Sequence, residues 1–212
     1  MKQKHIIDAF KGATGPFVLV LIVAFHRLES TTAWLYLALH GTYGVLWVLK
    51  SRIFPDRQWE APLQPLRALM LVGGLAMYWI APVIITVYDV ELSAFHMAGA
   101  VSLFGFGVFF HFAADLQKYT ALKIAPGLIT TGLFTHIRNP NYFGELLIYT
   151  SFSLLALERI SWPAGWLPFL AFASIVIVEW IPNMRRKDAS LSRYPEFAEY
   201  KKRTWLILPF LV

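Results

Sequence analysis

Residues 131–149 read TGLFTHIRNPNYFGELLIY, and this stretch decides the fold that we expect. After a glycine turn and a basic loop, Asn139 and Pro140 predict a helix N-cap followed by proline at the first helical position. The helix that follows is apolar, yet Asn141 and Glu145 lie four residues apart and therefore on one face. A carboxylate one turn inside an apolar helix is costly, so Glu145 calls for a functional explanation.

The composition is that of a polytopic membrane protein. The chain has 212 residues, of which 57% are hydrophobic and 15% charged, and its mean hydropathy is +0.53. A soluble domain is usually about half apolar and a quarter charged. The sequence contains no cysteine, which excludes disulfides and thiolate metal sites.

The apolar segments predict an all-α bundle of about six transmembrane helices, forming a single integral membrane domain. The first segment is short for a span of about 20 residues, and its start is placed at residue 13 or earlier, near Ile6. Residues 1–12 are expected outside the membrane, as are a polar loop at 115–139 and a basic tail at 183–212. The six expected segments cover residues 13–26, 31–49, 68–88, 92–114, 140–157 and 162–181.

The distribution of Lys and Arg predicts the orientation. Of the 19 basic residues, 17 fall in the N-terminal segment, in the loops after the second and fourth apolar segments, or in the tail. Only Arg27 and Arg159 fall on the opposite side. The positive-inside rule then places both termini in the cytoplasm, and it accounts for the net charge of +6 without a nucleic-acid partner.

Three polar clusters are expected on the cytoplasmic side. His111, Asp115 and Lys118 share a helical face, and Arg138 precedes the second set, which consists of Asn141, Glu145 and Tyr149 in steps of four. The third cluster is the tail sequence MRRKDASLSRYPEFAEYKKRT at 184–204. Together they predict a pocket open to the cytoplasm, suited to a large anionic cofactor whose reactive end meets a lipid-soluble substrate.

Each cluster also has a purely structural interpretation. Asp115 and Lys118 could form an ordinary interfacial ion pair, and the basic run at 185–187 could serve only as a topology determinant. The helix dipole favours a carboxylate near an N-terminus, which would explain Glu145 without catalysis. Tyr142, Tyr149 and Trp180 fit an interfacial aromatic belt.

Two familiar kinds of site have no motif in this sequence. Neither HxxxH nor HExxH occurs, so we expect no metal. Neither GxGxxG nor GxxxxGK[ST] occurs, so any nucleotide would be held by side chains and helix ends.

Three blocks of the C-terminal half carry a family resemblance. The blocks are FFHFAADLQKYTALK, GLFTHIRNPNYFGE and RYPEFAEYKKRTWLILPFL, within residues 105–212. In combination they resemble steroid 5α-reductases and the DUF1295-like bacterial membrane proteins grouped with them. Sterol C14-reductases, with RHPNYxGD, are more distantly similar. Isoprenylcysteine carboxyl methyltransferases and phospholipid methyltransferases share a looser RHPxYxG.

The resemblance implies a membrane-embedded, NADPH-dependent oxidoreductase that reduces a C=C bond in a lipophilic substrate such as a steroid, sterol, enone or polyprenyl compound. It implies a cofactor half at 115–212, leaving 1–114 as the substrate side. Asp115 would contact the cofactor, and Asn141 and Glu145 its nicotinamide side. The other residues that the resemblance suggests for NADPH are His111, Lys118, Lys123, Arg138, Tyr142, Arg185, Arg186, Asp188, Tyr194 and Tyr200.

The substrate side departs from the 5α-reductases. Here HGTYGVLW at 40–47 stands near the family's HYxxRT stretch, and the glutamate that contacts the steroid has no counterpart. Tyr43, Glu145 and Tyr149 are the candidate catalytic groups, and the proton donor stays unassigned.

Two other functions stay open. One is an S-adenosylmethionine-dependent membrane methyltransferase, and the other is a non-catalytic membrane protein that keeps only the fold. Those methyltransferases carry a Glu-Glu pair after the last span, where this chain has Arg185-Arg186-Lys187-Asp188. A cation cluster favours a polyanionic dinucleotide over a sulfonium. We expect a multi-pass protein of a bacterial inner membrane in preference to the endoplasmic reticulum.

Overall fold

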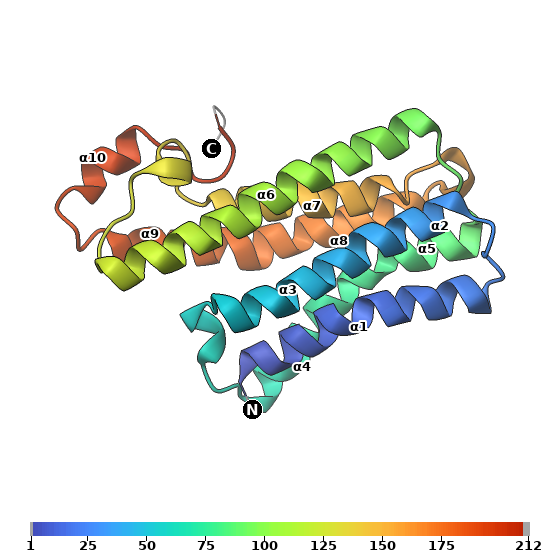
Figure 1. The fold of residues 1–212 in the computed structure, drawn as a ribbon, viewed down its shortest axis with the longest axis horizontal. Helices are drawn as coiled ribbons and strands as arrows, with labels where there is room; N and C mark the ends of the chain where they lie inside the picture. Colours follow the sequence, from blue (N-terminus) through green and yellow to red (C-terminus); the bar gives the residue numbers. More distant parts are fainter. Residues whose placement is uncertain (1, 210–212) are drawn as a thin grey trace.

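Long helices joined by short connections make up the computed structural model, which describes residues 2–209 (Figure 1). Within these residues there is no β-strand, only two isolated bridges, so the all-α prediction is confirmed. The helices are α1 (Gln3–Ala24), α2 (Thr31–Tyr36), η1 (Leu37–Gly41), α3 (Thr42–Ile53), η2 (Arg57–Glu60), α4 (Pro65–Ala76), η3 (Met77–Trp79), α5 (Ile80–Tyr88), α6 (Ala94–Ile124), η4 (Gly132–Phe134), α7 (Pro140–Leu154), η5 (Arg159–Ser161), η6 (Ala164–Trp166), α8 (Leu167–Ile175), η7 (Val176–Trp180), α9 (Ile181–Leu191) and α10 (Phe197–Lys202).

Four helical runs of the described chain are long and apolar enough to cross a membrane: Gln3–Ala24, Pro65–Tyr88, Ala94–Ile124 and Ala164–Leu191. The run from α2 to α3 and the 15-residue α7 are not among them. Many large apolar side chains on these runs, such as Leu69, Phe106 and Ile177, are exposed, as expected for helices that face lipid. The fold is thus compatible with a multi-pass membrane protein, while six spans and the orientation stay predictions.

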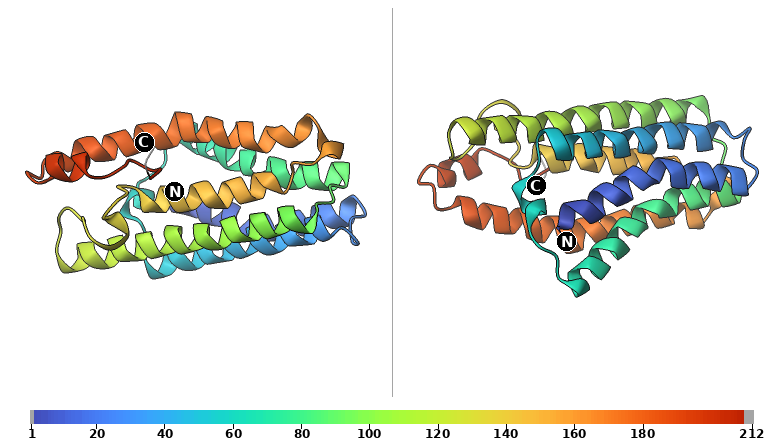
Figure 2. Two further views of the ribbon diagram at one scale, coloured as in Figure 1. Left: turned by 90° about the horizontal axis from the view of Figure 1, so that it is seen from above. Right: turned by 60° about the horizontal axis from the view of Figure 1, so that its bottom comes forward.

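The helices run back and forth between two ends of the molecule. At one end lie the N-terminus, the α3–α4 and α6–α7 connections, and the tail with α10 (Figures 1 and 2). We call this the polar end, because most of the basic residues belong to these segments. The turns after α1, α5 and α7 lie at the other end, where Arg27 pairs with Asp89 at 3.0 Å.

Glycines allow two helix pairs to approach closely. A Cβ on Gly44 of α3 would stand 2.2 Å from the carbonyl oxygen of Lys11 in α1. On the other pair, a Cβ on Gly144 of α7 would stand 2.3 Å from the backbone nitrogen of His111 in α6, and one on Gly107 would meet Gly144. The glycine of NPNYFGE therefore sets the distance between α6 and α7.

Three helical runs lose regular α geometry partway along. The segments η1 and η7 are π-helical, and η3 is a 3₁₀ turn. Proline lies just beyond two of them, at Pro82 and Pro182, and removes the N–H that would bond the carbonyl four residues earlier. In the first case that carbonyl is Tyr78, which accepts a long hydrogen bond of 3.4 Å from Tyr36.

Three helices extend beyond the apolar segments that the sequence predicted. The α6 helix does not end at residue 114 but continues to Ile124, because DLQKYTALK contains no helix breaker and Pro126 first disfavours helix at Ala125. The last run continues through the basic residues to Leu191 for the same reason. The α1 helix begins at Gln3, so most of residues 1–12 are helical and Lys11 is buried.

Candidate functional site

A cavity of about 580 Å³ lies between the helices. Its lining comes from α1, α3, η2, α4, η3, α6, α7, the run from α8 to α9 and the connections beside η2. Along these helices the lining residues step from Gln3, Gln58 and Arg186 at the polar end to Lys11, Tyr78 and Tyr149 further in. We call the inner three the floor of the cavity. Its volume is in the range of small-molecule and cofactor sites.

About half of the predicted site residues line this cavity. They are His111, Asp115, Asn141, Tyr142, Glu145, Tyr149 and Arg186. Tyr43 does not line it but donates a hydrogen bond of 2.9 Å to Glu145 Oε1. Asn141 and Glu145 thus face the same cavity, as their spacing predicts, and Tyr43 is brought to them from a position 102 residues earlier.

The floor combines a lysine with tyrosines. Lys11 Nζ donates a hydrogen bond to the hydroxyl of Tyr149, and the ring of Tyr149 stacks on Tyr78 with centroids 4.1 Å apart. The Tyr43 ring meets Tyr149 edge-on at 6.0 Å. The hydroxyls of Tyr78 and Tyr149, which line the cavity, are potential donors to a ligand that reaches the floor.

A buried ion pair lines the wall between the floor and the polar end. Lys50 Nζ lies 2.7 Å from Asp115 Oδ2, and both side chains are 4% exposed. The ring of His111 stacks on Trp47 at 5.6 Å, and its Nδ1 lies 3.3 Å from the carbonyl oxygen of Asn141. His111 Nε2 and Asp115 Oδ1 are buried without a hydrogen-bond partner within residues 2–209. Buried polar atoms are normally hydrogen-bonded, so these two atoms are exceptions, and Lys118 Nζ lies 3.5 Å from Asp115 Oδ1.

Lys118 and Lys123 do not line the cavity. Lys118 Nζ lies 2.6 Å from Asp56 and 3.5 Å from Asp115 Oδ1, which draws the segment before η2 onto α6. Lys123 is exposed one turn further on, with Nζ 4.3 Å from the centre of the Tyr119 ring. Both side chains lie beyond the expected end of the fourth apolar segment, on the part of α6 that hydropathy did not predict.

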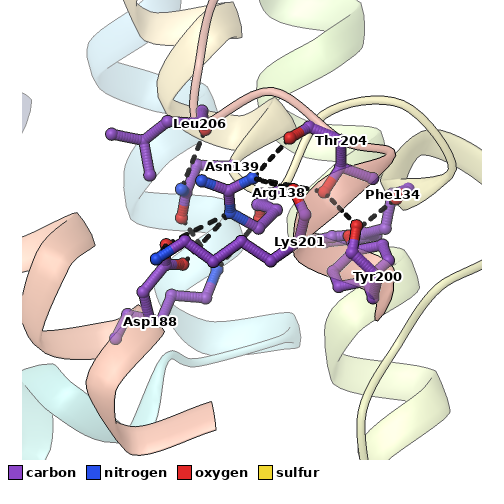
Figure 3. A network of polar contacts seen from close by, with 9 residues as sticks. Phe134, Arg138, Asn139, Asp188, Tyr200, Lys201, Thr204 and Leu206 are labelled. Atoms are coloured by element: carbon purple, nitrogen blue, oxygen red, sulfur yellow. Dashed lines mark hydrogen bonds and ion pairs between the residues drawn. The ribbon is translucent and has the colours of Figure 1, made fainter. Parts of the chain in front are cut away.

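Arg138 and Asp188 form part of a network that binds the tail to the start of α7 (Figure 3). Arg138 Nε lies 3.2 Å from Asp188, and its Nη1 donates to the carbonyl oxygen and, at 3.2 Å, to the hydroxyl of Thr204. Tyr200 donates at 2.7 Å to the carbonyl oxygen of Phe134, and burial raises its pKa to about 12, so the hydroxyl stays protonated. We call this network the tail clasp.

Asn139 belongs to the tail clasp and does not cap its helix. It occupies the N-cap position, with Pro140 at the first helical position as predicted, but its side chain makes no cap hydrogen bond. Its amide instead donates to the carbonyl oxygen of Leu206 at 2.9 Å and accepts from Lys187 at 3.0 Å. The expected side-chain cap was wrong, because tertiary partners 48 and 67 residues away in the sequence hold both ends of the amide.

The two arginines after the last apolar segment differ in position. Arg186 lines the cavity and donates to Asn183 Oδ1 of the preceding turn. Arg185 is exposed and lies outside the cavity lining. Tyr194 is also outside it, with the Arg193 guanidinium 4.9 Å from its ring centre. The structure therefore brings one arginine of the pair to the site.

Sequence reasoning missed Lys11, Trp47, Lys50 and Tyr78. A signal for the two lysines was present: the buried residues of α1 are Ile7, Lys11, Thr14, Val18 and Ile22, and those of α3 are Tyr43, Gly44, Trp47 and Lys50. Both sets repeat at helical spacing, so each lysine stands on an otherwise buried stripe. Tyr78 carries no such mark, because only the packing of η3 turns it inward.

No group of three or more His, Asp or Glu side chains suited to a metal occurs within residues 2–209. The comparison with family models gives one match, described as "Protein of unknown function (DUF1295)", over residues 1–204. The comparison with curated proteins gives no match, and neither does the comparison with solved structures.

Proposed function

Because the chain belongs to the family of unknown function DUF1295, a steroid 5α-reductase-like group, we propose that it is a membrane-embedded, NADPH-dependent reductase. Its substrate would be a lipophilic molecule with a C=C bond conjugated to a carbonyl, or a related sterol or polyprenyl alkene. The observation that carries this proposal is the pair of unsatisfied polar atoms, His111 Nε2 and Asp115 Oδ1, beside Glu145 in one cavity.

The unsatisfied pair fits the cofactor. A nicotinamide carboxamide offers one acceptor and two donors. In the neutral ring His111 Nδ1 donates to the carbonyl oxygen of Asn141, so His111 Nε2 would accept from one N–H of the carboxamide, and Asp115 Oδ1 would accept from the other. A buried polar atom without a hydrogen bond costs about 1–3 kcal/mol, so a ligand that bonds both atoms would gain affinity there. Asn141 lines the same cavity.

The polar end of the cavity supports an anionic cofactor. Arg67 and Arg186 line it there, from α4 and α9. Arg186 is bonded to Asn183 but to no carboxylate within the described residues, so its charge is available to a phosphate. Guanidinium groups match phosphate oxygens in geometry as well as charge.

An apolar side opening supports a lipophilic substrate. The cavity lining includes Met70 of α4 and Val178 of η7, whose side chains are more than half exposed on the outside of the bundle. Figure 2 shows α4 leaning away from the other helices at the polar end. A substrate dissolved in lipid would therefore reach the cavity from the side, past Leu71 and Ile175.

NADPH would supply a hydride to the substrate. Glu145, which accepts a hydrogen bond of 2.9 Å from Tyr43, would position the reacting groups. These groups would lie between the floor and the part of the cavity wall that contains His111. A methyltransferase is the competing candidate, since aromatic rings and Glu145 would suit a sulfonium.

Binding of NADPH tests the proposal. Purified protein in nanodiscs would be titrated by calorimetry with NADPH, NADH and S-adenosylmethionine. We expect NADPH to bind most tightly. Binding of S-adenosylmethionine alone would replace the reductase proposal with the methyltransferase.

Arg185 and Arg186 provide a matched pair of variants. Arg186→Ala should weaken the binding of NADPH by about ten- to a hundredfold, which is the contribution of a charge-assisted hydrogen bond. It should weaken the binding of NADH less. Arg185→Ala should change neither affinity by more than about twofold, because Arg185 lies outside the cavity lining. Equal effects of Arg186→Ala on the two nucleotides would mean that Arg186 does not read the 2′-phosphate.

A further inference from the structure

The floor of the cavity contains a lysine that the proposed function does not yet use. The Lys11 side chain is 5% exposed, stands on the buried stripe of α1 and lines the cavity. The close approach of Gly44 to the Lys11 carbonyl holds this turn of α1 against α3. Lys11 is therefore a fixed group, not a side chain that reaches in from the surface.

Four aromatic rings surround the Lys11 ammonium. Its Nζ lies 4.5 Å from the ring centre of Tyr43, 4.9 Å from Trp47, 5.0 Å from Tyr149 and 5.2 Å from Tyr78. Each such contact stabilises a cation by about 0.5–2 kcal/mol, depending on desolvation. The rings thus offset part of the cost of burying the charge.

Within the described residues Lys11 has no carboxylate at ion-pair distance, although the charge of Glu145, which lines the same cavity, acts on it. The other lysines near the cavity are paired: Lys50 with Asp115 at 2.7 Å, and Lys118 with Asp56 at 2.6 Å. Lys11 makes one hydrogen bond, to the Tyr149 hydroxyl, while an ammonium has three N–H donors. A buried cation with unused donors, facing a cavity, is suited to an oxygen atom of a ligand.

We propose that Lys11 is a catalytic residue that binds the carbonyl oxygen of the substrate and protonates it during reduction. This assignment rests on the proposed function and names its substrate class: a lipophilic α,β-unsaturated ketone or aldehyde. The tyrosine rings and Trp47 flank the substrate's apolar body where it reaches the floor.

The step balances as follows. The nicotinamide, when bound, would supply a hydride and be left oxidised; a C–H bond would form at the β-carbon of the substrate while the C=C electron pair shifts to make the enolate oxygen. Lys11 gives one proton to that oxygen and becomes a neutral amine. The enol then becomes the saturated carbonyl compound by moving this proton to the α-carbon. A proton from water, entering by the polar end, restores the ammonium.

An enolate mimic tests this assignment without the cofactor or the natural substrate. The probe is 2-naphthol, whose naphtholate anion absorbs at a longer wavelength than the neutral form. Bound beside Lys11 at pH 7.5, it should be ionised to a greater extent than in buffer, because the ammonium stabilises the anion. A bound probe that is wholly neutral on the wild-type protein would overturn the assignment, whichever variants fold.

Variants separate the charge of Lys11 from its packing. Lys11→Met should bind the probe but lower its ionisation constant at least tenfold, while Lys11→Arg keeps most of the ionisation. Lys2→Met, at the N-terminus, is the matched control and should behave as wild type. Unchanged ionisation in Lys11→Met would contradict the assignment.

The two proposals fail separately. Lys11-dependent ionisation of 2-naphthol in a protein that does not bind NADPH would leave the oxygen-binding role of Lys11 standing and overturn the reductase. Binding of NADPH, together with 2-naphthol ionisation that does not depend on Lys11, would leave the reductase proposal standing and overturn the role of Lys11.

Discussion

Glu145 is tied to Tyr43 by a hydrogen bond of 2.9 Å and faces the cavity. Glu145→Gln keeps an oxygen that accepts from Tyr43, so the variant should fold as wild type. The rate of NADPH oxidation with an enone substrate should fall by about 100-fold, because Glu145 would position the reacting groups and misplacing them by about 1 Å costs about that much. Thermal denaturation would check folding. A variant that fails to fold would support the helix-dipole interpretation of Glu145 instead.

At the level of single residues, sequence reasoning found the polar groups that lie on α6 and α7. Spacing within one helix is enough to place Asn141 beside Glu145. It cannot bring Tyr43 to Glu145, because these residues come from different helices and only the packing of α3 against α7 decides the contact. The basic tail was assigned to the cofactor, yet Arg138, Asp188 and Tyr200 contact one another or nearby backbone in the tail clasp.

At the level of helices, the close packing of α6 against α7 depends on Gly144. Gly144→Ala would place a Cβ 2.3 Å from the backbone nitrogen of His111, which neither helix can avoid without moving. We expect a loss of about 1–3 kcal/mol of stability or more from this overpacking, measured by thermal denaturation in detergent.

Gly105→Ala is the matched control for that variant. Gly105 lies in α6 as well, but a Cβ there would meet nothing within 4 Å. The control should be neutral or slightly stabilising, because alanine favours a helix over glycine. Equal destabilisation by both variants would mean that the close approach of α6 and α7 at Gly144 does not cause the loss of stability.

The tail clasp makes a separate prediction. Arg138→Ala leaves Asp188 without its closest basic partner, and removing one member of a buried ion pair costs about 3–5 kcal/mol. The tail should then detach, so trypsin should cleave after Lys201–Arg203 at least tenfold faster. Arg193→Ala, which removes an exposed side chain, should leave the cleavage rate unchanged.

For the molecule as a whole, the orientation can be tested directly because the chain contains no cysteine. Variants in which Arg57 or Arg203 is replaced by cysteine test the accessibility of the polar end. Variants in which Glu91 or Arg159 is replaced test the other end. All four positions are exposed. In intact cells a membrane-impermeant maleimide should label only the cysteines at 91 and 159. Labelling of 57 and 203 without lysis would reverse the orientation.

Much of the whole-molecule architecture followed from hydropathy and charge. Apolar runs located the long helices, but hydropathy marks where lipid can lie, not where a helix ends. The α6 helix therefore extends ten residues past its apolar part, until proline intervenes. The cavity could not be predicted, since it results from the departure of α4 from its neighbours and from the 3₁₀ and π segments η3 and η7, which interrupt regular α geometry.

The tail clasp also sets an order of events during synthesis. Arg138 and Asn139 find their partners in Thr204 and Leu206, which the ribosome adds 66 and 67 residues later. At about 5–20 residues per second, the entrance to α7 waits roughly 3–13 s for these partners. Every apolar helix is made before then, so a nascent chain can insert its helices while the start of α7 still lacks its partners in the tail.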